Sequence, residues 1–232
     1  MTVIPNFFQC EFCSKTFAKE KNLQKHNCEY MKRYEHITKK GSGIVLYRLY
    51  IFWLKDKKRS TRYVDHHTFI HSTHYKPFVR FMEFAKKYSL PNKKTYISYC
   101  NSREISPKFW TDEELYEDFI TYYDELYPYQ KQLETSFTTV FQICEWLGVD
   151  DPSKIFEELD GGTVLELLRR RKISPWLFFN STVFMDYLKT TASVEERDHI
   201  QKVTNPKRWR EIFEKNPDKR KKVIDLVKEM GL

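Results

Sequence analysis

The sequence has few features of nucleotide-binding loops, membrane spans or secreted proteins. Only 6 of its 232 residues are glycine, and neither a P-loop nor a G-x-G-x-x-G motif occurs. No uninterrupted run of about 18 apolar residues is present, as a membrane helix would require. The first nine residues do not place a basic region before an apolar one, as a secretion signal does. We therefore expect no membrane partner and no secretion.

The cysteines and the absence of a secretion signal together predict a cytoplasmic protein. In a reducing compartment thiols bind metal ions or lie buried, and they seldom form disulfides. We expect the last two of the five cysteines, Cys100 and Cys144, to be buried thiols.

Charge is segregated along the chain. Residues 1–103 carry 21 Lys/Arg and 7 Asp/Glu, residues 104–164 carry 3 and 15, and residues 165–232 carry 16 and 10. The basic segments suit a polyanion such as nucleic acid. The acidic middle would repel it, and could instead bind a protein partner.

The pattern of apolar residues predicts a mainly α protein, with a small ββα zinc finger followed by an all-helical domain. Capping-box patterns begin at Thr111, Thr163 and Ser193. Residues 89–110 look irregular, because prolines and asparagines break the periodicity there. The expected helices are 19–39, 43–55, 64–70, 73–88, 112–126, 130–147, 152–159, 163–171, 175–189, 193–202, 206–214 and 217–230.

Charge and periodicity together predict three parts. Residues 1–38 form the zinc finger with a helical extension, and residues 39–103 form a basic helical subdomain. Residues 104–232 form a helical domain that is first acidic and then basic, with a seam near 104–111.

A metal-ligand pattern stands near the amino terminus. Cys10 and Cys13 form a Cys-x2-Cys pair, and twelve residues separate Cys13 from His26. Three apolar residues lie where a miniature core would need them: Phe8, Phe17 and Leu23. The segment resembles a C2H2-type zinc finger, in which a hairpin and a helix each supply two ligands to one tetrahedral Zn²⁺.

The fourth ligand departs from the family pattern, which places it about three to five residues beyond the first histidine. Cys28 comes too early and His36 too late. We favour Cys28, a reduced thiol close to the ion, and keep His36 as the alternative. With Cys28 as a ligand, the helix must kink or end at His26, and residues 29–39 must form a separate helix.

Fingers of this family read bases from the start of their helix. The corresponding side chains here are those of Lys19, Lys21, Asn22 and Lys25. A lone finger covers only about three base pairs, so a structural or protein-docking role is the alternative. Further basic candidates for nucleic-acid contact are Lys32, Arg33, Lys39, Lys40, Lys57, Lys58, Arg59 and Arg62, unless they merely form a solvated face.

Three other clusters have more than one interpretation. His66, His67, His71 and His74 could bind a second metal ion, contact phosphate or simply pack. The carboxylates within 112–125 suit the start of a capped helix, or a catalytic metal site. Residues 169–172 are basic and suit a helix C-terminus, or a second binding site.

Outside the finger, two aromatic runs look like uncharacterised proteins of T4-like tailed phages: residues 28–34 and 69–81. This resemblance implies a phage product that works in the host cytoplasm. It implies no catalytic residues.

The sequence therefore predicts a zinc-finger, nucleic-acid-binding accessory or regulatory protein of replication, recombination or transcription. A protein adaptor that docks a host or phage enzyme is the alternative, and a metal-dependent nuclease is the third. No nucleophile–base motif supports an enzyme, so we expect a binding protein.

Overall fold

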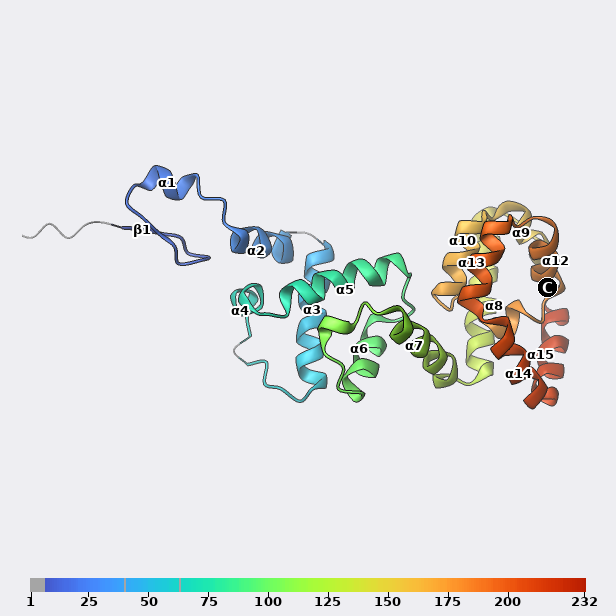
Figure 1. Ribbon diagram of the computed structural model, residues 1–232. Helices are drawn as coiled ribbons and strands as arrows, with labels where there is room; N and C mark the ends of the chain where they lie inside the picture. The colour runs from blue at the N-terminus through green and yellow to red at the C-terminus, as the bar shows by residue number, and fades with distance from the viewer. Residues whose placement is uncertain (1–6, 40, 63) are drawn as a thin grey trace, which may run out of the picture. The chain divides into compact units, whose positions relative to one another are not determined.

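The computed structural model describes residues 7–39, 41–62 and 64–232 and divides into two compact units (Figure 1). Unit 1 consists of Met1–Lys87 and Lys93–Phe119, and unit 2 consists of Tyr88–Asn92 and Ile120–Leu232. Within the described ranges the one sheet has two strands, and the other regular structure is helical. The expected mainly α fold with a small amino-terminal ββ element is confirmed.

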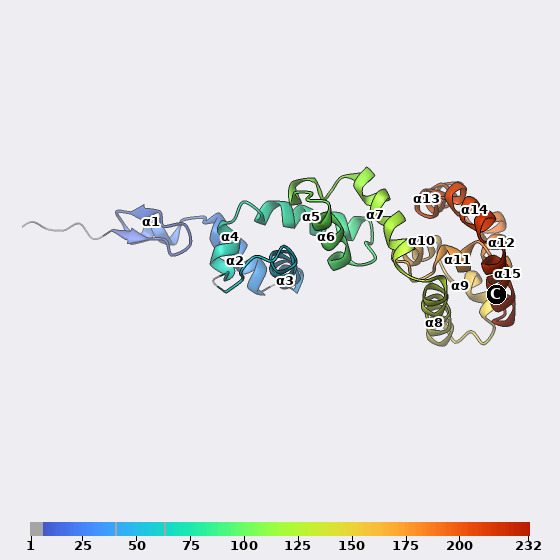
Figure 2. The same cartoon turned by 90° about the horizontal axis from the view of Figure 1, so that it is seen from below.

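The elements of unit 1 follow the chain closely. They are β1 (Phe8–Gln9), β2 (Thr16–Phe17), α1 (Glu20–Gln24), α2 (Glu29–Lys39), α3 (Gly41–Asp56), α4 (His66–His71), α5 (Tyr75–Lys87), α6 (Lys93–Ser102), the 3-10 helix η1 (Pro107–Phe109) and the first half of α7 (Glu113–Leu126). In Figure 2, which looks almost along α3, α2 and α4 lie beside it. None of the described helices combines the length and hydropathy that crossing a bilayer requires.

Aromatic side chains form the core of unit 1. Trp110 is fully buried, and its ring centroid lies 5.2 Å from that of Phe78 and 5.3 Å from that of Phe81. The Tyr96 hydroxyl donates a hydrogen bond to the Trp110 carbonyl at 2.8 Å. Each such ring removes roughly 150–250 Å² from water, which explains the use of so many Phe and Tyr residues.

Helix α6 corrects the expectation that residues 89–110 are irregular. Asp56, the last residue of α3, accepts hydrogen bonds from the Ser98 hydroxyl at 2.9 Å and the Asn101 amide at 2.6 Å. Four side chains of α6 are buried: Tyr96, Ile97, Tyr99 and Cys100. These four positions lie on one side of the helix, but two of them are tyrosines and one is a cysteine, so the apolar stripe is weak in the sequence. Burial of this face outweighs the modest helix propensity of the segment.

Of the three expected capping boxes, one is confirmed. The Ser193 hydroxyl accepts the backbone N–H three residues on, and the glutamate there accepts the N–H of Ser193. The boxes expected at Thr111 and Thr163 are wrong, because a neighbouring carboxylate takes the capping role. Asp112 accepts an N–H at the start of α7, and Asp160 does the same at the start of the helix Gly161–Arg169.

Unit 2 contains the second half of α7 and the helices that follow it. They are α8 (Tyr129–Leu147), the 3-10 helix η2 (Pro152–Lys154), α9 (Ile155–Glu158), α10 (Gly161–Arg169), α11 (Pro175–Phe178), α12 (Thr182–Thr190), α13 (Val194–Thr204), α14 (Pro206–Lys215) and α15 (Pro217–Glu229). The expected helix 175–189 is divided in two, because the Ser181 hydroxyl caps α12. Residues 104–119, which the charge pattern groups with the C-terminal part, belong to unit 1.

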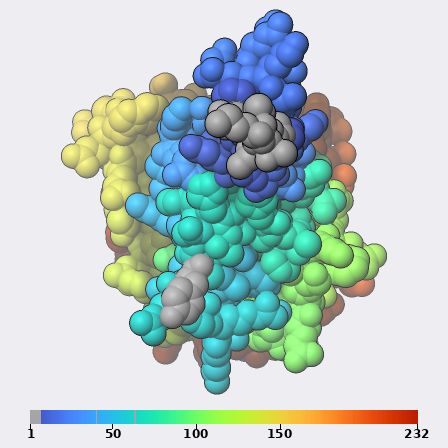
Figure 3. Space-filling view, turned by 90° about the vertical axis from the view of Figure 1, so that its left-hand side faces the viewer, coloured from blue at the N-terminus to red at the C-terminus, as the bar shows by residue number. Residues whose placement is uncertain are grey.

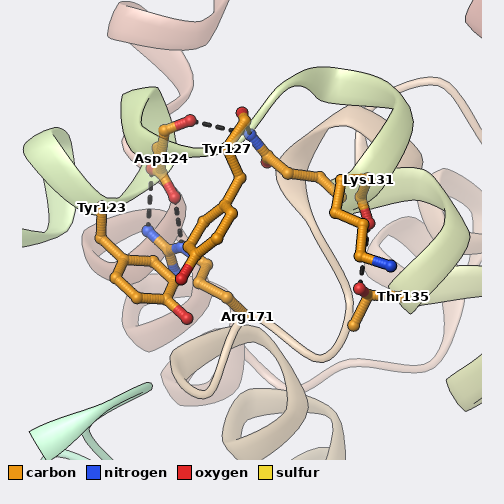
Figure 4. Close-up of a pocket in the computed structure, with 7 residues that line it drawn as sticks. Tyr123, Asp124, Tyr127, Lys131, Thr135 and Arg171 are labelled. Carbon is orange, nitrogen blue, oxygen red and sulfur yellow. Dashed lines mark hydrogen bonds and ion pairs between the residues drawn. The ribbon is translucent and has the colours of Figure 1, made fainter. Parts of the chain in front are cut away.

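A buried ion-pair cluster joins three segments of unit 2. Asp124 of α7, whose side chain is 2% exposed, accepts hydrogen bonds from the Arg171 Nε at 2.6 Å and Nη2 at 3.1 Å. Arg208 of α14 donates to the same carboxylate at 3.1 Å. Figure 4 shows this pair beside Tyr123 and Tyr127, which help to line a cavity of about 130 Å³. Asp124 therefore forms a buried ion pair that joins these segments, and it does not belong to the group of carboxylates at the start of α7.

Replacing Asp124 with alanine should destabilise unit 2 by about 3–5 kcal/mol, because the buried Arg171 guanidinium loses its counter-charge. The matched control is Glu125→Ala: Glu125 also pairs with Arg208 but is 70% exposed, so its loss should cost less than about 1 kcal/mol. Urea unfolding followed by circular dichroism measures both changes. Equal unfolding midpoints for the two variants would contradict a stabilising role of the buried Asp124–Arg171 ion pair.

Helices α2 and α3 approach closely at Gly43. A Cβ atom there would lie 1.9 Å from the carbonyl oxygen of His36, a backbone atom that cannot move aside alone. Gly43→Ala should therefore lower the stability of unit 1 by about 1–3 kcal/mol or more. Gly41 lies on the same helix, and a Cβ atom there would have nothing within 4 Å, so Gly41→Ala should change the unfolding midpoint little. A similar loss of stability in both variants would contradict a steric clash at Gly43.

Candidate metal centre

The β1–β2 hairpin positions the first two donors. Phe8 pairs with Phe17 across the hairpin. The backbone N–H of Ser14 donates to the Cys10 carbonyl at 2.9 Å, and Ser14 has a φ of 58°, in the left-handed region that closes tight turns. This turn brings the Cys10 and Cys13 thiols to the same side of the hairpin.

The second pair of donors lies where one helix ends and the next begins. Helix α1 ends at Gln24, and α2 begins at Glu29, directly after Cys28. The Cys28 carbonyl accepts the backbone N–H of Lys32 at 3.2 Å, so Cys28 starts α2. The continuous helix 19–39 is wrong, and the separate helix over residues 29–39, expected if Cys28 is a ligand, is confirmed.

Four donor atoms converge between these elements. The ligand atoms of Cys10, Cys13, His26 and Cys28 all lie within 4.8 Å of one another, and the Cys13 Sγ lies 3.1 Å from the His26 Nε2. This arrangement is compatible with one tetrahedral metal ion. His36, the alternative fourth donor, is not in the cluster; its Nδ1 lies 3.1 Å from the Tyr75 hydroxyl.

The two buried thiols of the cluster differ in acidity. Burial works against ionisation of Cys10, but backbone N–H groups of Cys13 and Phe12 donate to its sulfur and hold its pKa below the ordinary value. Burial raises the pKa of Cys28, and the neighbouring thiols of Cys10 and Cys13 raise it further, against the effect of the Met31 N–H at the start of α2. A bound cation would favour both thiolates.

Phe12, inside the Cys-x2-Cys turn, anchors the finger to the helical part of unit 1. Its ring lies 5.6 Å from that of His67 in α4, with an angle of only 9° between the planes, and 5.4 Å from that of Tyr34 in α2. The space-filling view looks from the side of the finger, which is blue and lies in front of the blue-green segments that follow it (Figure 3). The ligand pattern alone does not predict this role of Phe12. The signal for it in the sequence is an aromatic residue that the finger's own core does not require.

Arg33 holds α2 onto α4. Its guanidinium lies over the rings of Tyr30 at 4.9 Å and Tyr75 at 4.8 Å. It donates to the carbonyl of Ile70 at 2.8 Å and forms an ion pair with Glu29. With its side chain only 12% exposed, this predicted nucleic-acid contact has an evident structural role.

The four clustered histidines pack individually against aromatic rings. The pairs are His66 with Tyr47, His67 with Phe12, His71 with Tyr30 and His74 with Trp53. Burial and the nearby cations Arg59, Lys57 and Lys108 lower the pKa of His74, which favours its neutral form. In the part of the chain that the structure describes, neither these histidines nor the 112–125 carboxylates form a second group of three metal donors.

The base-reading positions predicted for the finger come together on α1 and its ends. Lys19, Lys21, Asn22 and Lys25 are all exposed. Lys32, on α2, is exposed too. All five residues lie close in the sequence to the ligands His26 and Cys28.

The remaining predicted contacts lie elsewhere. Lys57, Lys58, Arg59 and Arg62 occupy the loop between α3 and α4, which leaves α3 at the end away from α2 (Figure 1). Lys57 and Arg59 each lie 5.6 Å from the centre of the Trp53 ring. Lys39 forms an ion pair with Glu35 at 2.9 Å, and Lys40 lies outside the described residues. The structure thus separates the predicted contacts into a finger group and a loop group.

Comparison with known proteins adds no relative: no family model, no curated protein and no solved structure matches the chain. The resemblance to phage proteins stays a prediction.

The two candidate fourth ligands can be separated with Co²⁺, whose visible spectrum reports tetrahedral thiolate coordination. Cys28→Ala should weaken metal binding by about 100-fold or more, since four ligands share a binding free energy of about 10–16 kcal/mol. His36→Ala should leave the affinity unchanged. Cys100→Ala is the control for loss of a buried thiol, because burial raises the pKa of Cys100 to about 12 and it is not in the cluster. The opposite result, with His36→Ala losing the metal and Cys28→Ala keeping it, would exclude the present ligand set.

Proposed function

We propose that Cys10, Cys13, His26 and Cys28 hold one structural Zn²⁺, and that unit 1 binds nucleic acid through the lysines of its finger. Three thiolates and one imidazole form a donor set that Zn²⁺ prefers. Zn–S bonds of about 2.3 Å in a tetrahedron would place the sulfurs about 3.8 Å apart. The observed separations of at most 4.8 Å are close to this.

The proposed ion supports folding and not hydrolysis. Four protein donors fill a tetrahedral coordination shell, whereas a catalytic zinc keeps one position for water or substrate. A finger of about thirty residues buries too little apolar surface to fold alone, so metal binding would supply the missing free energy. A nuclease that uses this centre therefore has no support.

The observation that carries the nucleic-acid proposal is the state of the finger lysines. Lys19, Lys21 and Lys25 are exposed, and none forms an ion pair with a described residue. In contrast, Arg33 is paired and largely buried. Exposed ammonium groups that form no ion pair are available to phosphate.

The distribution of charge between the units supports the same surface. Unit 1 carries 22 Lys/Arg and 13 Asp/Glu, a net charge of +9, whereas unit 2 carries 18 and 19, a net charge of −1. Long-range attraction of a polyanion would therefore act on unit 1. Helix α1 has only five residues, so we propose phosphate contacts as the main source of affinity, with little reading of bases.

In this proposal the protein is an accessory or regulatory factor of a machine that replicates, recombines or transcribes nucleic acid. The exposed carboxylates at the start of α7 would then face a protein component of that machine.

Two triple variants with the same change in charge test the proposal. Lys19, Lys21 and Lys25 are changed together to glutamine in one, and Lys219, Lys221 and Lys222 of α15 in the other. The finger variant should bind a mixed-sequence duplex more weakly, and its plot of log K against log salt should be shallower by about 3, because each lost phosphate contact removes about 0.9. Anisotropy titrations of the zinc-loaded protein at several salt concentrations measure both quantities.

The α15 variant should keep the affinity and slope of the wild type. Equal losses in the two variants would mean that only net charge matters and would remove the finger as the binding surface. Removal of the metal with a chelator should reproduce the loss seen in the finger variant.

A further inference from the structure

Trp146, near the end of α8, is far more exposed than the other tryptophans. It is 80% exposed, whereas Trp53, Trp110, Trp176 and Trp209 are at most 6% exposed. Burial of an aromatic side chain is normally favourable by a few kcal/mol. A tryptophan left in water on an otherwise well-packed unit is an unused contact surface of the kind that forms binding hot spots.

The exposed ring lies at a hollow between α8 and α10. The hollow has a volume of about 350 Å³. On α8 the lining positions are 139, 142, 143 and 146, which the helical repeat places on one face. Ile143 and Leu167 supply an apolar surface, and Thr139, Thr163 and Gln142 supply polar groups.

The charges at the hollow are few but mostly positive. Arg170 and Lys172 contribute cations and Glu166 contributes one carboxylate. Arg170 pairs with Glu166 at 2.6 Å. Lys172 is exposed and makes no ion pair with any described residue. One cation is therefore left for an anionic group of a ligand.

We infer that this hollow binds a nucleotide unit of a single-stranded nucleic acid, with its base stacked on Trp146 and its phosphate at Lys172. A flat ring with polar edges and an attached phosphate matches an exposed indole, two apolar side chains, hydroxyl and amide groups and a nearby ammonium. The hydroxyls of Thr139 and Thr163 already donate to the Thr135 carbonyl and the Asp160 carboxylate, and from a ligand they can still accept a hydrogen bond. An apolar peptide would leave Gln142 and the cation unused. A duplex does not fit, because its bases are already stacked on one another.

This inference extends the proposed nucleic-acid binding to unit 2 and rests on it for the class of polymer. It concerns other residues and another form of nucleic acid, so the two can be tested apart. The residues of the basic segment 169–172 then have different roles. Arg171 is buried against Asp124, while Arg170 and Lys172 line the hollow.

Tryptophan fluorescence of the zinc-loaded, full-length protein provides the test, because Trp146 is largely exposed and the other tryptophans are buried. Oligo(dT) should quench part of the emission and protect Trp146 from acrylamide, and both effects should disappear in Trp146→Phe. Trp146→Ala should weaken oligo(dT) binding about 5- to 100-fold, the loss expected for one base stack. At low salt, Lys172→Gln should weaken oligo(dT) binding more than the control Lys228→Gln does. Lys228 is an exposed residue of α15, and its change to glutamine removes the same charge.

The outcomes separate this inference from the finger proposal. Quenching of Trp146 that survives in the finger triple variant would support the hollow, whether or not that variant still binds duplex. Normal duplex binding by that variant would count against the finger alone. Loss of duplex binding in the triple variant without quenching of Trp146 by any strand would overturn the hollow and leave the finger. Equal quenching by duplex and single strand would overturn it, and so would protection of Trp146 by a protein partner alone.

Discussion

Cys28 connects the candidate metal centre to the helices of unit 1. Its thiol belongs to the four-donor cluster, and its carbonyl accepts the hydrogen bond from Lys32 that starts α2. Because α2 contacts both α3 and α4, the position of one ligand sets the direction of a helix on which the next two elements pack. Loss of a metal ion here would therefore disturb more than the hairpin.

The position of a basic side chain decides whether it stabilises the fold or is available to a ligand. Arg33 and Arg171 are both largely buried, and each has carbonyl and carboxylate acceptors for its guanidinium. Guanidinium groups suit such sites, because their several donors satisfy several acceptors at once. The finger lysines are exposed ammonium groups on flexible stems, which suit a phosphate backbone that is contacted without a fixed geometry.

The local features of the centre could be predicted from the sequence, and the long-range contacts could not. The Cys-x2-Cys turn, His26 and the separate helix after Cys28 follow from ligand spacing and tetrahedral geometry. The residues of the Asp124–Arg171 pair are 47 positions apart in the sequence, so no local sequence pattern predicts their contact. Helix α6 is hard to predict, because its buried face consists of two tyrosines, an isoleucine and a cysteine and differs little in hydropathy from the rest of the segment.

The two proposed nucleic-acid surfaces would act over different distances. The net charge of +9 on unit 1 attracts a polyanion over about one Debye length, roughly 8–10 Å at physiological salt, and this attraction weakens as salt rises. Stacking on Trp146 requires direct contact, so it acts only at short range and can hold a base on a unit whose net charge is −1. A strand would thus be attracted through unit 1 and recognised as single-stranded through unit 2, because only an unpaired base exposes a face to the indole.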